Sequence, residues 1–285
     1  IKERPDIVDS LFPSESSFIP GIKDGSKKVL ELHFNKYFRI QYGRHGLLGL
    51  SDKLRTRQDE KIVRKFDSFV VLTEEDKGYC GELPNIEVIP NAAVTTDIFQ
   101  SHCLVHRVIA VGRLDYQKGF DRLIEAWSIV KKDSEYSDWQ LDIFGQGEWK
   151  EMLEMMIQEK GLADSVHINK PTNEISNEYA RSSMLVMSSH FEGLPMVMIE
   201  AMTCGLPAVT FDFKCGPKDI IDDGKNGLLV PEGDVPGLAE AMKRLMSDES
   251  LRRRMGTEAL RIKEKYSEEA VMGRWIRLFE KLTKE

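Results

Sequence analysis

The sequence has few cysteines and no long apolar run, and each shortage argues against a class of protein. Four cysteines are scattered among 285 residues without a CxxC pair, which favours free thiols over a disulfide framework. No run of about 18 apolar residues is present, so we expect no membrane-spanning helix. The first 20 residues lack a basic stretch followed by an apolar one, so we expect no signal peptide. The sequence therefore predicts a cytoplasmic protein.

The composition is that of an ordinary globular protein, but its charge is unevenly placed. Hydrophobic residues make up 41% and charged residues 31%, and a chain of this length favours two domains. The net charge is −7, yet residues 21–65 hold twelve basic and five acidic side chains, which leaves +7 there and −14 elsewhere. Such a basic segment favours binding to anionic lipid or to an anionic substrate. A well-solvated helix face is the alternative.

From Arg107 onward, short apolar runs alternate with segments of helical period. This alternation predicts a parallel sheet with helices on both faces, which is a doubly wound, Rossmann-like α/β domain. The predicted strands are 107–112, 139–145, 165–168, 184–189, 207–213 and 227–230. The predicted helices are 120–132, 148–161, 174–182, the segment after Pro195, 217–222 and the region from about 235 to the end.

The first hundred residues resemble the second half of a similar domain. Thr73 precedes three acidic residues and is a good helix N-cap. Three or four strands make a thin domain, so we expect the chain to begin part-way through it. The predicted strands here are 6–10, 28–34, 67–73 and 86–91. The predicted domains are 1–100, an incomplete N-terminal one; 101–267, the second Rossmann-like one; and 268–285, a helix crossing back to the first domain.

The loop "VGRLDYQKGF" joins the first strand of the second domain to the helix after it. Gly112 allows close backbone approach, while Arg113 and Lys118 bracket the N-terminus of that helix. Two cations beside a positive helix end predict a phosphate site. A loop with two solvated cations is the alternative, and the order of residues required for a P-loop is missing.

The loop "FGQGEW" (144–149) contains two glycines but not the third that a dinucleotide-binding turn requires. A tight turn between strand and helix is the better interpretation. This argues against a nucleotide-dependent dehydrogenase.

The segment "FEGLPMVMIEAM" carries two carboxylates eight positions apart. Its turn, Gly193-Leu194-Pro195, lacks a side chain at the glycine and suits a helix start, so backbone amides there can reach a diphosphate. Glu200, further along the helix, can accept hydrogen bonds from both hydroxyls of a ribose. Glu192 would then face the group beyond the phosphates. A helix-dipole partner at Glu192 and a surface charge at Glu200 are the alternatives.

Taken together, "VGRLDYQKG", "HFEGLPMVMIEAMTCGLPAV" and "CGPKDIIDDGKNGLLV" closely resemble family 4 of the retaining glycosyltransferases. That family has the GT-B fold, in which two Rossmann-like domains face a cleft. The resemblance extends from about residue 86 to residue 280. It implies that Glu200 holds the nucleotide ribose and that Glu192 faces the donor sugar. It also implies that Arg113 and Lys118 neutralise the diphosphate.

Earlier in the chain, "ELHFNKYF" resembles the first-domain segment that carries an active-site histidine in this family. The resemblance places His33 in the cleft, and a capped structural histidine is the alternative. "VIPNAAV" matches the stretch before the interdomain linker. The family's first strands, with their glycine-rich loop, have no counterpart before Ile1, so the N-terminal domain is expected to be truncated.

No metal or other cofactor is expected. The Asp222-Asp223 pair is suited to a metal by residue type, but "IIDDGKNG" is typical of a turn that ends a helix. The resemblance implies that cationic side chains replace a metal at the diphosphate.

The resulting functional hypothesis is the transfer of a hexose from a nucleoside diphosphate sugar, with UDP favoured, to an acceptor hydroxyl with retention of configuration. "FDFKCGP" resembles bacterial enzymes that build surface polysaccharides or lipid-linked glycans. A lipid-linked glycan acceptor would place the protein at the inner face of an anionic membrane, and no nucleic-acid partner is expected. A non-catalytic nucleotide-sugar-binding module or an inactive fragment is the alternative. The spacing of the two glutamates argues against a GT-B epimerase.

Overall fold

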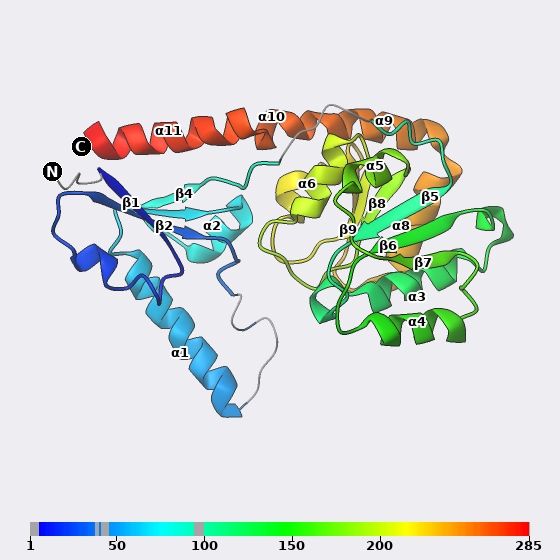
Figure 1. The fold of residues 1–285 in the computed structure, drawn as a ribbon, viewed down its shortest axis with the longest axis horizontal. Coiled ribbons are helices and arrows are strands. Elements are labelled where there is room, and N and C mark those ends of the chain that lie inside the picture. Colours follow the sequence, from blue (N-terminus) through cyan, green and yellow to red (C-terminus); the bar gives the residue numbers. More distant parts are fainter. Residues whose placement is uncertain (1–5, 38–39, 41–45, 94–99, 285) are drawn as a thin grey trace. The chain divides into compact units, whose positions relative to one another are not determined.

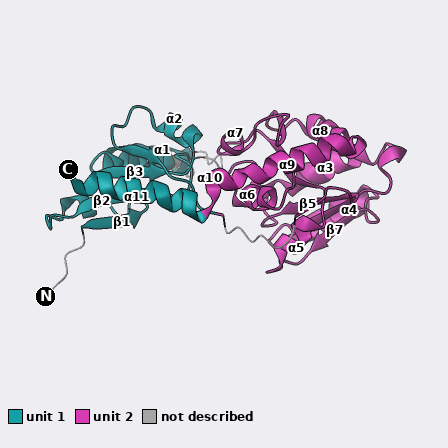
Figure 2. Ribbon diagram, turned by 90° about the horizontal axis from the view of Figure 1, so that it is seen from above, with its two compact units in different colours: residues 1–92, 268–285 teal, residues 93–267 magenta. Residues whose placement is uncertain are grey.

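The computed structural model describes residues 6–37, 40, 46–93 and 100–284, and the chain divides into two compact units (Figures 1 and 2). Unit 1 comprises residues 1–92 and 268–285, and unit 2 comprises residues 93–267. The boundary between the units therefore lies at 92/93, whereas the sequence suggested 100/101. The C-terminal helix is part of unit 1.

Unit 1 is built on a four-stranded parallel sheet in the order β1-β2-β3-β4. Each strand overlaps one that the sequence predicted, because short β-branched runs bounded by polar residues favour buried parallel strands. The strands are β1 (Ile7–Leu11), β2 (Lys27–Leu32), β3 (Ser68–Val71) and β4 (Ile86–Val88).

Helices cover both faces of this sheet (Figure 1). On one face, α1 (Gly46–Val63) contributes Ile62 and Val63 to a core shared with Leu30 of β2. On the other face, α11 (Glu268–Lys284) packs its apolar side on Val29. Successive strand residues point to opposite faces, so the two neighbours in β2 enter separate cores. The remaining helices are η1 (Ile19–Gly21) and α2 (Glu74–Cys80).

The predicted N-cap of α2 is confirmed. Thr73 has an extended backbone, and its hydroxyl accepts a hydrogen bond from the Asp76 amide at 3.0 Å. Three acidic residues follow in the first turn, where the helix dipole favours negative charge.

Unit 2 contains a six-stranded parallel sheet in the order β10-β9-β8-β5-β6-β7. The chain starts in the middle at β5, extends to β7 on one side, and then returns to β8 and extends to β10 on the other. The carboxyl ends of β5 and β8 therefore flank a topological switch point, where doubly wound folds bind ligands. The strands are β5 (Arg107–Val111), β6 (Gln140–Phe144), β7 (Val166–Asn169), β8 (Met184–Met187), β9 (Ala208–Phe211) and β10 (Gly227–Val230).

Helices also cover both faces of the sheet in unit 2, which confirms the predicted doubly wound arrangement. α3 lies between α4 and α8 on one face, while α6 packs with α5 and α9 on the other (Figure 1). The longer helices are α3 (Phe120–Val130), α4 (Lys150–Glu159), α5 (Ile175–Ala180), α6 (Met196–Thr203), α8 (Val235–Ser247) and α9 (Glu249–Ala259). The shorter ones are η2 (Tyr116–Lys118), η3 (Ser134–Tyr136), α7 (Pro217–Ile220), η4 (Leu260–Ile262) and α10 (Lys263–Tyr266).

The cysteines agree with a further expectation. All four cysteines are free thiols. Among the described residues, no helix is long and apolar enough to cross a membrane.

Candidate functional site

The loop between β5 and α3 brings Lys118 back over the end of β5. Asp115 begins η2, and its carboxylate accepts a hydrogen bond from the Lys118 amide at 3.2 Å. The side chain of Lys118 then runs across Gly112. A Cβ atom at Gly112 would lie 3.0 Å from the Lys118 Cγ and Cδ atoms, which is tighter than almost all real contacts. Glycine at this position therefore makes room for the lysine.

Gly119 allows this loop to pack closely against the end of β8. It adopts a left-handed conformation with φ of 59°, and a Cβ atom there would lie 2.3 Å from the Ser188 carbonyl oxygen. Only glycine fits both demands. The Ser188 hydroxyl donates to the Lys118 carbonyl at 3.1 Å, and Arg122 donates to the Ser188 carbonyl at 2.5 Å. The two strand ends at the switch point are thus joined.

The loop "FGQGEW" is the turn between β6 and α4, as the sequence indicated. A Cβ atom at Gly145 would lie 2.0 Å from the Gly112 carbonyl oxygen, and one at Gly147 would lie 2.3 Å from the Leu114 carbonyl oxygen. The Leu114 amide also donates to the Gln146 carbonyl at 2.9 Å. The two glycines therefore let this loop pack against the preceding one.

The third loop holds the backbone of Glu192 in place. The Glu192 amide donates to the Lys214 carbonyl at 2.8 Å, and the Glu192 carbonyl accepts from the Cys215 amide at 3.1 Å. These bonds connect the loop after β8 to the segment after β9. They fix the backbone of Glu192, from which its carboxylate extends.

The turn Gly193-Leu194-Pro195 leads into α6. Pro195 is the N-cap residue with ψ of 81°, one position before the first helical turn that the sequence favoured. Leu194 is buried. The amides of Met196 and Met198 donate to the carbonyls of Leu194 and Pro195 at 2.9 and 3.0 Å. These two amides are already engaged, which reduces the number available to a diphosphate.

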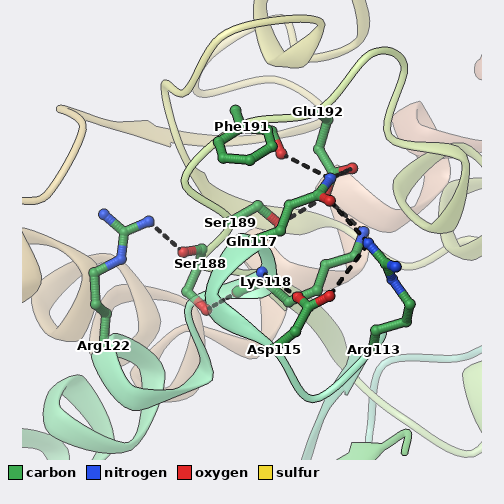
Figure 3. Close-up of polar contacts among 9 residues, drawn as sticks. All are labelled: Arg113, Asp115, Gln117, Lys118, Arg122, Ser188, Ser189, Phe191 and Glu192. Atoms are coloured by element: carbon green, nitrogen blue, oxygen red, sulfur yellow. Dashed lines mark hydrogen bonds and ion pairs between the residues drawn. The ribbon is translucent and has the colours of Figure 1, made fainter. Parts of the chain in front are cut away.

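Lys118 and Glu192 form a largely buried ion pair at the switch point (Figure 3). The Lys118 Nζ atom lies 2.6 Å from Glu192 Oε1, and the two side chains are 14% and 8% exposed. Ser189 donates to the same oxygen at 2.8 Å, and Gln117 donates to Oε2 at 3.1 Å. Both carboxylate oxygens of Glu192 therefore have partners.

Arg113 extends this network toward solvent (Figure 3). Its side chain is 67% exposed, and its Nη2 atom lies 3.2 Å from Asp115 Oδ2. The same nitrogen donates to Gln117 Oε1 at 3.0 Å, so Gln117 links Arg113 to Glu192. The sequence analysis did not identify Gln117 or Ser189, because neutral polar residues carry no distinctive pattern.

Glu200 of α6 faces a separate cavity of about 350 Å³. Burial raises the pKa of its carboxyl group. Among the described residues, its carboxylate has no hydrogen-bond or ion-pair partner. The other lining residues are Val111, Gly112, Arg113, Phe144, Gly145, Gln146, Pro171, Thr172, Ile175 and Tyr179.

Four of these lining residues lie in the segment 170–179 after β7, which the sequence analysis predicted to be partly helical but did not assign to the site. One signal was available, since this segment follows a predicted parallel strand and therefore starts at the same sheet edge as the other loops.

His33 lies in unit 1, directly after β2. Its Nε2 atom is 2.8 Å from Glu31 Oε2, and its side chain is 37% exposed. The hydrogen bond to Glu31 raises the pKa of His33. Burial and the hydrogen bond to Glu31 raise the pKa of Asp9, on the neighbouring strand β1, to about 7. The sequence analysis missed Asp9 and Glu31, although residues two apart on a strand share a face.

The Asp222-Asp223 pair forms the expected turn. Asp222 pairs with Lys225 at 3.2 Å, and Asp223 accepts a hydrogen bond from the Leu229 amide at 2.9 Å. Within the described part of the chain, no group of three or more His, Cys, Asp and Glu side chains is placed to hold a metal ion.

Several known proteins have sequences similar to this chain. Residues 106–261 match the family described as "Glycosyl transferases group 1". The chain is 33% identical over 274 residues to the amylovoran biosynthesis glycosyltransferase AmsD of Erwinia amylovora, covering 89% of this chain and 75% of that protein. It is 36% identical over 222 residues to an exopolysaccharide phosphotransferase of Streptomyces coelicolor, covering 76% of this chain and 23% of that protein.

Solved structures agree. The crystal structure of TarM superimposes with a TM-score of 0.80 at 27% identity, covering 96% of this chain and 54% of TarM. A Staphylococcus aureus TarM variant in complex with UDP and alpha-GlcNAc-glycerol gives a TM-score of 0.79 at 26% identity, covering 95% of this chain and 55% of that one. The predicted GT-B fold is therefore confirmed.

The matched family segment spans more than half of the chain and contains Lys118, Glu192 and Glu200. On this evidence, the chain belongs to the group 1 glycosyltransferases.

Proposed function

We propose that the chain is a retaining hexosyltransferase of the family 4 type, which uses a UDP-sugar as donor. The observation that carries this proposal is the arrangement at the switch point of unit 2. A buried lysine–glutamate pair, Lys118–Glu192, occupies the loops after β5 and β8, and an unpaired carboxylate, Glu200, faces the adjacent cavity. The TarM variant solved with UDP supports the choice of nucleotide.

Each residue has a role that follows from its chemistry. The Glu200 carboxylate has free acceptor sites and binds the ribose hydroxyls. Lys118 and the exposed Arg113 neutralise the diphosphate. When the sugar departs, negative charge develops on that diphosphate, and preorganised cations stabilise it in the transition state. Glu192 faces the sugar while holding Lys118.

His33 is proposed to act on the acceptor side. The Glu31 carboxylate holds its imidazole at 2.8 Å, which fixes the ring orientation. Because no metal is needed in this scheme, no cofactor is proposed.

An anionic acceptor is supported by a second cavity, which lies within unit 1 and measures about 420 Å³. Its lining includes the apolar Leu32 and Phe69 of the core, the carboxylates Asp59 and Glu60, and Lys36, which pairs with Glu60. Three further cations line it on and beside α1, namely Arg57, Lys61 and Arg64. Among the described residues these three cations have no carboxylate partner. An apolar wall with three cations that lack a carboxylate partner suits a lipid-linked glycan carrying phosphate.

The main alternative is a nucleotide-sugar-binding module without transferase activity. The coverage supports this alternative, because the chain matches only 54% of TarM. UDP release from UDP-sugars and calorimetric UDP binding distinguish the two functions. We expect wild type to bind UDP and release it from at least one UDP-sugar, and we expect Glu200→Ala to weaken binding. Binding without release from any UDP-sugar would favour the module.

A further inference from the structure

Tyr179 of α5 carries a buried hydroxyl group that has no hydrogen-bond partner. The residue is 0% exposed, and its hydroxyl oxygen is closed to solvent. A buried polar group without a partner is destabilising, so native proteins retain very few of them, often at functional sites. Because the hydroxyl oxygen is closed to solvent, water cannot supply the missing hydrogen-bond acceptor.

The Glu200 carboxylate is the complementary group. Tyr179 and Glu200 line the same cavity of about 350 Å³, and they stand on the neighbouring helices α5 and α6. Burial raises the pKa of Tyr179 well above its usual value, and the Glu200 carboxylate adds to this effect. A phenol donates one hydrogen bond, whereas an ionised carboxylate accepts several and has no proton to donate.

We propose that Tyr179 is a positioning residue for the nucleotide: when the cavity is filled, its hydroxyl donates to one carboxylate oxygen of Glu200. The other oxygen is then directed at a ribose hydroxyl. This inference rests on the proposed function, which assigns the ribose to Glu200. It adds a buried contact that fixes the carboxylate, so the site gains selectivity for ribonucleotides over deoxyribonucleotides.

The Tyr179→Phe variant tests this because it removes only the hydroxyl. That hydroxyl has no partner in the unliganded protein, so the melting temperature without ligand should be equal to or above that of wild type. The dissociation constant for UDP should increase about three- to tenfold, as expected for one lost hydrogen bond. A merely structural role would instead lower the melting temperature and leave the dissociation constant for UDP unchanged.

Tyr266→Phe is the matched control. Tyr266 is a buried phenol outside the cavity, and its hydroxyl donates to the Asp219 carbonyl at 3.3 Å. Losing that bond should lower the melting temperature while leaving UDP affinity unchanged.

The pH dependence of binding gives a second, independent readout. A donor to a carboxylate stabilises its charged form and lowers its pKa. The contact forms only in the complex, so the Tyr179 hydroxyl strengthens UDP binding while Glu200 is charged and loses most of that effect once Glu200 is protonated. Since UDP also titrates, the ratio of the variant and wild-type dissociation constants is followed between pH 5 and pH 8. This ratio should decrease toward one as the pH decreases.

Calorimetry with UDP and with 2′- and 3′-deoxy-UDP compares wild type, Tyr179→Phe, Glu200→Gln and the double variant. In the Glu200→Gln background the tyrosine substitution should have less than half its effect in wild type. The ribose preference should decrease in Tyr179→Phe. Equal UDP affinity of Tyr179→Phe and wild type, or full additivity with Glu200→Gln, overturns this inference alone. A wild type that binds none of UDP, GDP and ADP overturns the proposed function as well.

Discussion

Lys118 and Glu192, 74 positions apart in sequence, form a 2.6 Å ion pair that is almost closed to solvent. A diphosphate bound at this lysine therefore has to share it with a carboxylate. Since the three donors to Glu192 already occupy both of its oxygens, the pair is preorganised before the donor arrives.

Replacing Glu192 should separate binding from catalysis. In Glu192→Gln the charge of Lys118 is no longer neutralised by its partner, so UDP affinity should stay equal to wild type or increase. Sugar transfer should decrease about 100-fold, which is typical for the loss of one preorganised polar group. Calorimetry and UDP release measure the two quantities. Glu148→Ala, which removes an exposed carboxylate from a neighbouring loop, should change neither; weaker UDP binding in Glu192→Gln would contradict the assignment.

Gly119→Ala should disrupt the junction of the two loops. The substitution combines a left-handed backbone with a contact of 2.3 Å to the Ser188 carbonyl. We expect a loss of about 2 kcal/mol or more in the free energy of unfolding, together with weaker UDP binding. Gly161→Ala is the matched control, because Gly161 has a similar φ of 66° but nothing within 4 Å of the added carbon. Equal destabilisation in both variants would show that the contact with Ser188 is unimportant.

Much of this site could be predicted from sequence because parallel sheets place the carboxyl ends of their strands at one edge. Once the alternation after Arg107 predicted such a sheet, the charged residues after two predicted strands had to lie at that edge. Periodicity thus located Lys118 and Glu192 without specifying that they touch.

The partners of these charges could not be predicted. Gln117, Ser189 and Tyr179 are neutral polar residues of common types, and each acquires its role only from the approach of distant loops or helices. Likewise, the approach of the Asp9 carboxylate to Glu31 and His33 depends on the register of β1 against β2, which hydrophobic pattern alone does not fix.

Asp9 should make the stability of the protein depend on pH. Burial and Glu31 raise its pKa to about 7, so the folded chain binds this proton more tightly than the unfolded chain. Its stabilising contribution is therefore present at acidic pH and is lost as the pH rises through about 7. Asp9→Asn is neutral throughout, so its melting temperature relative to wild type should rise between pH 5 and pH 8. An exposed control, Asp164→Asn, should keep a constant difference; the same constancy in Asp9→Asn would contradict the prediction.

Donor binding should persist without divalent metal. The diphosphate is proposed to meet Lys118 and Arg113, so a chelator should leave UDP affinity within about twofold of its value in added Mg²⁺. Calorimetry in EDTA, in Mg²⁺ and in Mn²⁺ measures this. Lys118→Ala should weaken binding in all three buffers. An absolute requirement for either metal would rule out the metal-independent scheme.

The basic segment 21–65 should bind anionic membranes. Within it, α1 exposes Leu48, Leu50 and Leu54 at 67%, 56% and 55%, with Lys53 beside Leu54 and with Arg55 and Arg57 following. Each Lys or Arg near an anionic leaflet contributes about 1 kcal/mol, and the attraction fades within a Debye length. Exposed leucines beside these cations add apolar contact, so we expect salt-sensitive binding to anionic vesicles and little binding to neutral ones.

Neutralising four arginines together tests which surface is responsible. The variant changes Arg39, Arg44, Arg55 and Arg57 to Gln; the first two lie outside the described residues, and the last two are exposed on α1. Its control changes four exposed arginines of unit 2, which are Arg181, Arg244, Arg253 and Arg254. Both variants lose the same charge, so net charge alone would weaken co-sedimentation equally. We expect only the first to detach from anionic vesicles at low salt, whereas equal recovery of wild type with neutral and anionic vesicles would leave α1 as a solvated helix face.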